Sequence, residues 1–255
     1  FILTMKRNLL IGMFMFSGVA LFSQKTVNSN TNRINETFEN GVTTARTFAP
    51  NGIVRCATTE YTKSKQARGI APTDDVFEAW LAPKIEEIKR QRLLGRLPSV
   101  IRIPVVVHVI HNGDAYGVNE NISDEQVQSQ ITVMNQDFRK LTGTPGFNSN
   151  AVGADTQVEF VLAKVDLNGN PTNGINRVNL CQATWSTTAI NSTVKPATIW
   201  DPTQYMNMWS VNFTDNSLLG YAQFPESSLA GMATTAQNPL TDGVVANYTT
   251  FGSSD

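Results

Sequence analysis

The sequence contains little of several residue types that mark particular protein classes. Among its 255 residues there are only two histidines, His108 and His111, which excludes a catalytic zinc site made of three histidines of this chain. There are only two cysteines, Cys56 and Cys181, too few for a disulfide scaffold. Neither sign of charge dominates, because 20 Lys and Arg stand against 21 Asp and Glu, and this balance argues against a general nucleic-acid binder.

The balanced total hides an asymmetry along the chain. Residues 1–112 carry 15 Lys and Arg against 8 Asp and Glu, a balance of +7, whereas residues 113–255 carry 5 against 13, a balance of −8. A basic segment can be a nucleic-acid-binding tail, but here the basic residues are scattered among apolar helical positions. Two segments that dock on each other explain the asymmetry at least as well.

The N-terminus has the pattern of an export signal. A positively charged start at residues 5–7 (Met-Lys-Arg) precedes an apolar run at residues 9–22 and the small residue Ser23. The alternative is a membrane anchor, but the run is shorter than the roughly 20 residues that span a bilayer. We therefore expect residues 1–23 to be a signal peptide and the protein to be secreted, without a stable membrane anchor.

The next part of the chain divides into a polar arm and a helical segment. Residues 24–51 are rich in Asn and Thr, which predicts an extended or disordered arm. Asp74 or Asp75 can cap a helix that Pro83 should kink or restart. A glycine and a proline then end the helix, and we place a domain boundary at residues 98–99. The apolar face of this helix consists of Phe77, Trp80, Leu81, Ile85, Ile88 and Leu93.

From residue 100 onward the pattern changes to strands and one well-marked helix. Residues 101–110 are β-branched and nearly continuous, as in a buried strand. Ser123 with Gln126 is a capping-box signal for a helix that reaches Phe138. This helix and the strands on either side of it predict a βαβ unit within an α+β or α/β fold with a twisted mixed sheet. Further strands are expected at residues 157–165, 205–213 and 242–248.

Two polar groups of residues could hold a metal ion but fit one poorly. Residues 166–170 begin like a calcium loop, yet Pro171 and Arg177 occupy the positions where such a loop needs Gly and Glu, so a polar turn is expected. His108 and His111 are three residues apart on a strand and project to opposite faces. We expect one buried, hydrogen-bonded histidine and one at the strand end rather than a shared metal site.

The two cysteines leave two interpretations open. Cys56 and Cys181 could form a disulfide in an oxidising compartment outside the cytoplasm. Alternatively Cys56, which lies beside Arg55 in a predicted loop, is a thiolate able to bind zinc. The residues alone do not decide between these interpretations.

Six segments cover much of residues 100–252. They are residues 103–111 (IPVVVHVIH), 123–138 (SDEQVQSQITVMNQDF), 155–162 (DTQVEFVL), 172–175 (TNGI), 219–225 (LGYAQFP) and 242–252 (DGVVANYTTFG). Together these segments resemble the pappalysin-type zinc metalloproteases of the metzincin clan. Because they occur in the order and at the spacing found in that family, the resemblance is more specific than any single motif.

The resemblance implies that residues 99–255 are the N-terminal part of a catalytic domain with a twisted mixed sheet and backing helices. In the family, the last of the six segments is an edge strand that lies along the active-site cleft and pairs with extended substrate. An ordinary edge strand without a ligand is the alternative. The residues that this assigns to substrate binding are Asp242, Gly243, Val244, Val245, Ala246, Asn247 and Tyr248.

The family's zinc-binding motif, HExxHxxGxxH, is expected beyond Asp255. It supplies the zinc histidines and the glutamate general base, so we expect a zinc-dependent endopeptidase as the full-length parent and an inactive incomplete chain here. The resemblance leaves calcium open as a second metal of the full-length parent. The loops that would hold it also lie beyond Asp255 in the family.

The same resemblance implies that residues 24–98 are a propeptide. Residues 55–60 (RCATTE) are similar to the family's cysteine-switch segment, although Ala57 stands where Gly is frequent. In such a latent form a thiolate, here that of Cys56, takes the fourth zinc position and displaces the catalytic water. A basic propeptide on an acidic catalytic domain would also explain the charge asymmetry. The expected partners are peptide or protein substrates and the intramolecular propeptide, with no nucleic acid.

Two other functions stay open. One is a non-catalytic secreted peptide-binding module, or pseudoprotease, that uses residues 242–248 as an edge strand. Half a metzincin would expose apolar surface that the zinc helix should cover, which argues against this alternative. The other is a β-rich adhesion domain. Trp185, Trp200 and Trp209 are compatible with it, but they fit a core and turns equally well.

Overall fold

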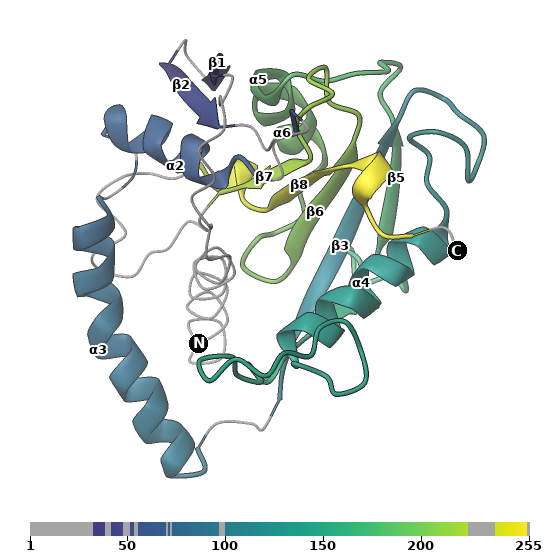
Figure 1. The fold of residues 1–255 in the computed structure, drawn as a ribbon. Coiled ribbons are helices and arrows are strands. Elements are labelled where there is room, and N and C mark those ends of the chain that lie inside the picture. The colour runs from purple at the N-terminus through teal and green to yellow at the C-terminus, as the bar shows by residue number, and fades with distance from the viewer. Residues whose placement is uncertain are drawn as a thin grey trace.

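The computed structural model describes residues 33–38, 42–47, 52–53, 56–69, 71, 73–96, 100–223 and 238–253. The predicted signal peptide and the predicted domain boundary lie outside these residues. Among the described helices, none has the length and apolar character that a membrane span requires. Figure 1 shows a central sheet with helices packed against it, and the long helix α3 (Asp74–Leu93) standing apart from that sheet.

A six-stranded mixed sheet forms the centre of the molecule. Its strands follow the order β4-β3-β6-β8-β7, and β5 pairs with the second half of β3 on the side where β4 pairs with the first half. All neighbours are parallel except β7 and β8, which confirms the predicted α+β fold with a mixed sheet. The strands are β3 (Ile101–His111), β4 (Val158–Leu162), β5 (Ile175–Asn179), β6 (Met206–Val211), β7 (Gly220–Ala222) and β8 (Val244–Asn247).

The sheet is buried on both faces, so one apolar core lies on each side of it. Successive side chains of a strand point to opposite faces, and in β6 Met208 points to one face and Trp209 to the other. The core that contains Met208 lies under α4 (Asp124–Phe138). The core that contains Trp209 lies under three consecutive helical turns, which are α5 (Thr187–Ala189), η1 (Ile190–Val194) and α6 (Lys195–Thr198).

The helix α4 begins at the predicted cap. The Ser123 Oγ accepts a hydrogen bond from the backbone N–H of Gln126 at 3.2 Å. The Gln126 side chain does not complete a capping box, since its Nε2 donates to the carbonyl oxygens of Tyr248 (3.2 Å) and Phe251 (3.0 Å). This side chain therefore fastens α4 to the chain that follows β8. Short 3-10 turns flank β8, namely η2 (Pro239–Thr241) and η3 (Tyr248–Thr250).

The described residues before residue 97 form two strands and two helices. Strands β1 (Arg33–Phe38) and β2 (Val42–Thr47) pair antiparallel, so the expected extended or disordered arm contains a β-hairpin. β-branched residues favour extended backbone. Two segments that contain them can therefore pair with each other even where they lack the apolar face of a core strand. The helices are α2 (Thr58–Ala67) and α3.

Two details of α3 differ from the sequence-based expectation. Its N-cap is Thr73, and Asp74 and Asp75 lie in the first turn, where the helix dipole favours acidic side chains. The helix also continues through Pro83 without a restart. A proline removes one backbone hydrogen bond, and salt-bridged pairs support the turns that follow it. These pairs are Glu86 with Lys89 and Glu87 with Arg90.

The position of β8 corrects one prediction. Residues 242–248 are expected to form an edge strand, but β8 pairs with β6 on one side and with β7 on the other. The predicted edge position is therefore wrong, and β7 is the edge of the sheet. The sequence pattern predicts neither β7 nor β5. Three residues are too few for β7 to display a period of two, and the apolar residues of β5, Ile175 and Val178, do not alternate with polar ones.

Candidate functional site

The edge strand β7 uses its inward backbone groups to pair with β8. The carbonyl oxygen of Leu219 accepts a hydrogen bond from the N–H of Asn247 at 2.8 Å, and the N–H of Gln223 donates to Gly243 at 3.4 Å. In an antiparallel pair these groups alternate with groups that point away from the neighbour. Gly220 and Ala222 thus turn their backbone groups toward the outside of the sheet.

The outward groups of β7 hold the segment that precedes α2. The backbone N–H of Ala57 donates to the carbonyl oxygen of Gly220 at 2.9 Å. The N–H of Ala222 donates to the Thr58 Oγ1 at 3.0 Å. Ala57 is fully buried as a result. Residues more than 160 positions apart in the sequence therefore meet through the backbone of an edge strand, which is how edge strands bind extended peptides.

Cys56 lies at this edge, one residue before the paired Ala57. Its side chain is exposed and its Sγ lies 3.0 Å from the Thr58 Oγ1. Cys181 is also exposed, and both thiols are free, so the disulfide interpretation is wrong for this structure. Arg55 lies outside the described residues. The described part of the chain contains no group of three His, Cys, Asp or Glu side chains that could hold a metal ion.

The helix α2 continues the contact beyond Thr58. Its residues Tyr61 and Lys65 are buried, and both side chains reach the Gln223 amide oxygen at the end of β7. The Tyr61 ring also meets the Tyr221 ring edge to face, with centroids 5.3 Å apart. The docked segment thus comprises residues 56–67, and it covers both the outer edge of β7 and part of the core beneath it.

The seven residues predicted to bind substrate lie behind this edge rather than on it. Gly243 has a φ of +138°, and a Cβ there would lie 2.3 Å from the Asn207 carbonyl oxygen, so only glycine lets the chain enter β8. The Asn247 side chain accepts a hydrogen bond from the N–H of Thr249 at 3.1 Å. Gly243 and Asn247 lie at the two ends of β8, and β8 in turn positions β7 by pairing with it. The outward groups of β7 itself carry no sequence signal, because they belong to the backbone.

The structure confirms the prediction of one buried, hydrogen-bonded histidine and one histidine at the end of the strand. His108 is fully buried, its Nε2 lies 2.9 Å from the Asn207 Oδ1, and its Nδ1 lies 3.0 Å from the Asn176 Nδ2. The ring also stacks on Trp209, with centroids 5.0 Å apart. Burial lowers the pKa of His108 to about 4, with the Asn207 hydrogen bond acting in the opposite direction. His111 lies at the end of β3, where its Nδ1 accepts a hydrogen bond from Gly113 at 3.1 Å.

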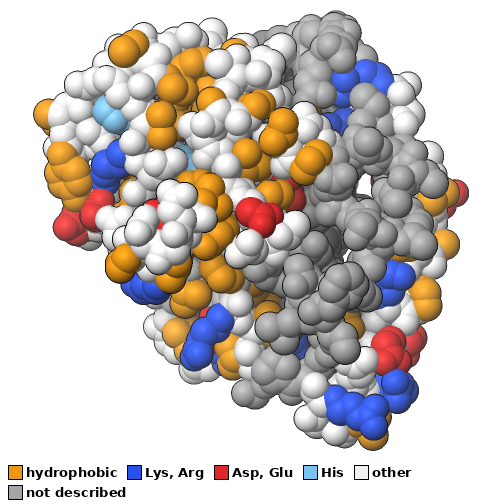
Figure 2. All heavy atoms as spheres, turned by 180° about the vertical axis from the view of Figure 1, so that it is seen from behind, with side chains coloured by type: hydrophobic (Ala, Val, Ile, Leu, Met, Phe, Trp, Pro, Cys, Tyr) orange, Lys and Arg blue, Asp and Glu red, His pale blue; other side chains and the backbone are white. Residues whose placement is uncertain are grey.

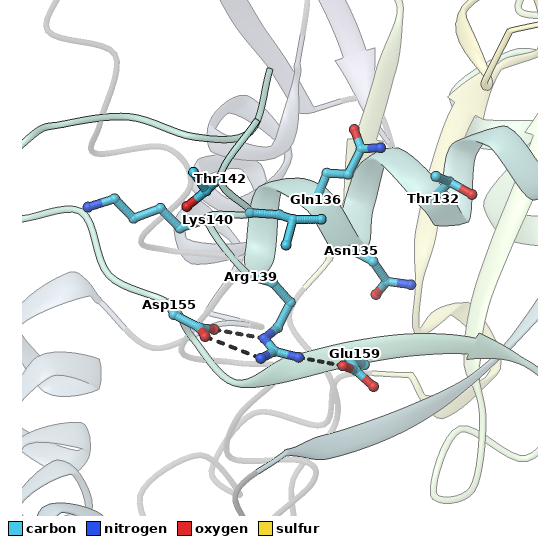
Figure 3. Close-up of a pocket in the computed structure, with 9 residues that line it drawn as sticks. Thr132, Asn135, Gln136, Arg139, Lys140, Thr142, Asp155 and Glu159 are labelled. Carbon is cyan, nitrogen blue, oxygen red and sulfur yellow. Dashed lines mark hydrogen bonds and ion pairs between the residues drawn. The ribbon is translucent and has the colours of Figure 1, made fainter. Parts of the chain in front are cut away.

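A hollow of about 590 Å³ beside the end of α4 lies away from this edge. Figure 3 shows Arg139 reaching from the end of α4 across to Asp155 and Glu159. The Arg139 Nε donates to Asp155 at 2.9 Å, and this pairing raises the pKa of the guanidinium. Two carboxylates thus neutralise this cation and tie α4 to β4. The second cation at the hollow, Lys140, donates to the Gly153 carbonyl oxygen at 2.8 Å. On the face in Figure 2, basic side chains lie in separate small groups.

The chain is similar to several solved structures, whereas no family model and no curated protein matches it. Tannerella forsythia mature mirolysin in complex with a cleaved peptide is 40% identical, with a TM-score of 0.51, over 62% of this chain and 57% of that chain. A promirolysin mutant of the same organism is 32% identical, with a TM-score of 0.54, over 79% of this chain and 62% of that chain. The chain spans less than two thirds of the length of either relative.

Proposed function

Because the chain resembles mirolysin and promirolysin, which are pappalysin-type metalloproteases, in sequence and in fold, we propose that it belongs to a secreted, zinc-dependent endopeptidase precursor. In this proposal residues 1–23 direct export, residues 24–98 are the propeptide and residues 99–255 contribute to the catalytic domain. The precursor match covers 79% of the chain and the mature match 62%, which agrees with an N-terminal part that only the precursor shares.

The observation that carries the proposal is the occupied outer edge of β7. Backbone groups that pair with Ala57 and Thr58 are the groups that an extended peptide substrate would use. A segment bound there excludes a substrate until it is removed, which makes the chain latent. The peptide-pairing role that the sequence assigns to residues 242–248 therefore passes to Gly220–Ala222 in this proposal, and β8 supports that strand from behind.

Zinc would be held largely by residues other than those described. His108 is unsuited as a ligand, since it is fully buried and both ring nitrogens are engaged. Cys56 fits a latent-state ligand, because its thiol is free and exposed at the docked segment. When bound, the metal would supply an activated water for peptide hydrolysis. The described residues do not complete its site.

The experiment is a peptidase assay on the precursor expressed from its full reading frame and secreted. We expect no activity before processing, activity after the propeptide is removed, and loss of that activity with a zinc chelator. A Cys56→Ser variant should show activity before processing, whereas Cys181→Ser, a matched change of the other exposed thiol, should stay latent. A processed protein that cleaves no peptide, or activity that survives the chelator, would contradict the proposal.

A non-catalytic peptide-binding module is the second candidate, and one observation favours it. The edge strand pairs with residues 57–58 through hydrogen bonds, and these bonds need no metal. In this case the processed protein would bind extended peptides without cleaving them. Mass spectrometry of a bound peptide after long incubation separates the two candidates, since only the peptidase produces fragments.

A further inference from the structure

The strand β4 lies, with β5, at the edge of the sheet opposite β7. The carbonyl oxygen of Gln157 accepts a hydrogen bond from β3 at 2.8 Å, and the N–H of Ala163 donates to β3 at 2.8 Å. Because backbone groups alternate in direction along a strand, those of Val158, Phe160 and Leu162 point away from β3. Outward groups of this kind are a template on which another extended chain can pair.

A side chain of α4 occupies the middle of this edge. The Asn135 Oδ1 accepts a hydrogen bond from the backbone N–H of Phe160 at 2.7 Å, and its Nδ2 donates to the carbonyl oxygen of Phe160 at 2.9 Å. Figure 3 shows Asn135 pointing from α4 toward the strand that carries Glu159. In an antiparallel pair, two hydrogen-bonded residues exchange the same two bonds. One amide side chain thus gives Phe160 what a residue of a neighbouring strand would give.

The needs of α4 do not explain an asparagine at this position. Asparagine is a poor helix former, because its side chain tends to bond to nearby backbone instead. Here both polar groups of Asn135 reach across to β4, 25 positions along the chain. The hollow of about 590 Å³ beside the end of α4 has Asn135 and Glu159 in its wall, so open space adjoins this edge.

We propose that Asn135 acts as a side-chain substitute for a strand, which closes the β4 edge and keeps the chain from pairing through β4 with a second copy of itself. Without this amide, two copies would pair antiparallel about a two-fold axis at Phe160. The N–H and C=O of Phe160 would then bond to the C=O and N–H of Phe160 in the second copy. Such a contact is self-complementary by symmetry, so no other surface has to be matched.

The two edges of the sheet are therefore closed in different ways. Asn135 belongs to α4, which core contacts and the ion pairs of Arg139 fasten to β4. The β7 edge is instead closed by Ala57 and Thr58, which leave with the propeptide in the proposed function. After that step an extended peptide would find β7 open and β4 still closed. Only this comparison rests on the proposed function, since the closure of β4 does not involve the propeptide.

Sedimentation velocity of the precursor, expressed from its full reading frame, tests the closure. Asn135→Leu keeps the size of the side chain and removes both groups that engage Phe160. Its dimer dissociation constant should be at least about ten-fold lower than that of the wild type, because two backbone bonds form at Phe160 in each dimer. Two controls weaken the contact between α4 and β4 without opening the edge. Asn135→Asp keeps an acceptor and adds a charge, and Arg139→Gln removes the ion pairs. Both should melt below the wild type and associate no more than it does.

A second substitution tests the register of the pairing. In a pair centred on Phe160, Val161 stands opposite Glu159 of the second copy, and Val161 is 37% exposed, so it can be replaced by a charged residue. Like charges directly opposite each other destabilise a strand pair. Adding Val161→Glu to Asn135→Leu should therefore return the dissociation constant to the wild-type value, whereas adding Val161→Lys should not.

Three results would overturn the proposal. They are an Asn135→Leu protein that melts lower but associates no more than the wild type, equal association of either control, and association that Val161→Glu leaves unchanged. Where Asn135→Leu does not fold, hydrogen exchange of the wild type decides. The outward amide of Phe160 should exchange as slowly as the inward amide of Ala163, and exchange more than about ten-fold faster would refute the closure. None of these measurements involves peptide cleavage, so a protein without peptidase activity would refute the proposed function and leave this test intact.

Discussion

The buried imidazole of His108 predicts that stability depends steeply on pH. Its folded-state pKa of about 4 lies below the value of about 6.5 that is ordinary for histidine, because a charged ring would lose its hydration in the core. Between these two pH values the unfolded chain binds a proton that the folded chain does not. The free energy of unfolding therefore falls as the pH falls through this window.

The magnitude follows from the size of the shift. One pKa unit corresponds to about 1.4 kcal/mol. As the pH falls through the window, the free energy of unfolding should therefore decrease by about 1.4 kcal/mol per pH unit, and by roughly 3 kcal/mol across the whole window. Below about pH 4 the ring is protonated in both states, and this loss ends. Above about pH 6.5 the ring is neutral in both states, and its contribution is constant.

Urea unfolding measures this effect, and tryptophan fluorescence reports it directly because Trp209 stacks on His108. A His108→Gln variant cannot titrate at this position. Between about pH 4.5 and pH 6, the slope of its free energy of unfolding against pH should be smaller than that of the wild type by about 1.4 kcal/mol per pH unit. Carboxylates titrate in both proteins and cancel in the comparison. Parallel pH curves for wild type and His108→Gln would refute the reasoning.

Three other changes test the docked segment, the end of the described chain and the thiols. Thr58→Val removes the hydroxyl that accepts from Ala222, so thermal denaturation should show a loss of about 1 kcal/mol that Thr58→Ser does not show. Gly252→Ala should cost more than about 2 kcal/mol in urea unfolding, because its Cβ would lie 2.1 Å from the Gln126 carbonyl oxygen. Gly169→Ala, which also has a positive φ but has nothing within 4 Å, should cost about 1 kcal/mol, and equal costs would contradict the clash. Because Cys56 and Cys181 are exposed and free, a thiol reagent should titrate both in native protein from which a chelator has removed metal, and fewer than two thiols in that unreduced protein would indicate a disulfide.

The elements that the sequence predicts well are those whose signal is local. The β-branched run of β3 is confirmed because a strand buried on both faces needs apolar residues at nearly every position. The start of α4 is confirmed because Ser123 caps it within its own first turn. The separation of His108 from His111 also follows from local geometry, since residues three apart on a strand face opposite sides.

The candidate site could not be predicted in the same way, because its contacts are not local. Gly220–Ala222 is too short to show a strand period, and its outward groups belong to the backbone, which has no sequence signature. The bond from Lys65 to Gln223 joins residues 158 positions apart. The residues alone leave Cys56 open between a disulfide and a zinc ligand, and they predict a strand at residues 242–248 without a role for it. The family resemblance supplies both roles, but it does not distinguish an edge strand from its neighbour.

The difference between β7 and β8 matters for selectivity as well as for topology. Outward backbone groups on an edge strand pair with almost any extended chain, so Gly220 and Ala222 cannot distinguish one peptide from another. Discrimination must come from side chains that lie next to the edge. Gln223 is the first residue after β7, it is buried, and it already holds a lysine of the docked segment. In the proposed precursor, residues 57–58 pair with the same backbone groups that an extended peptide substrate would use, so the two would compete for β7.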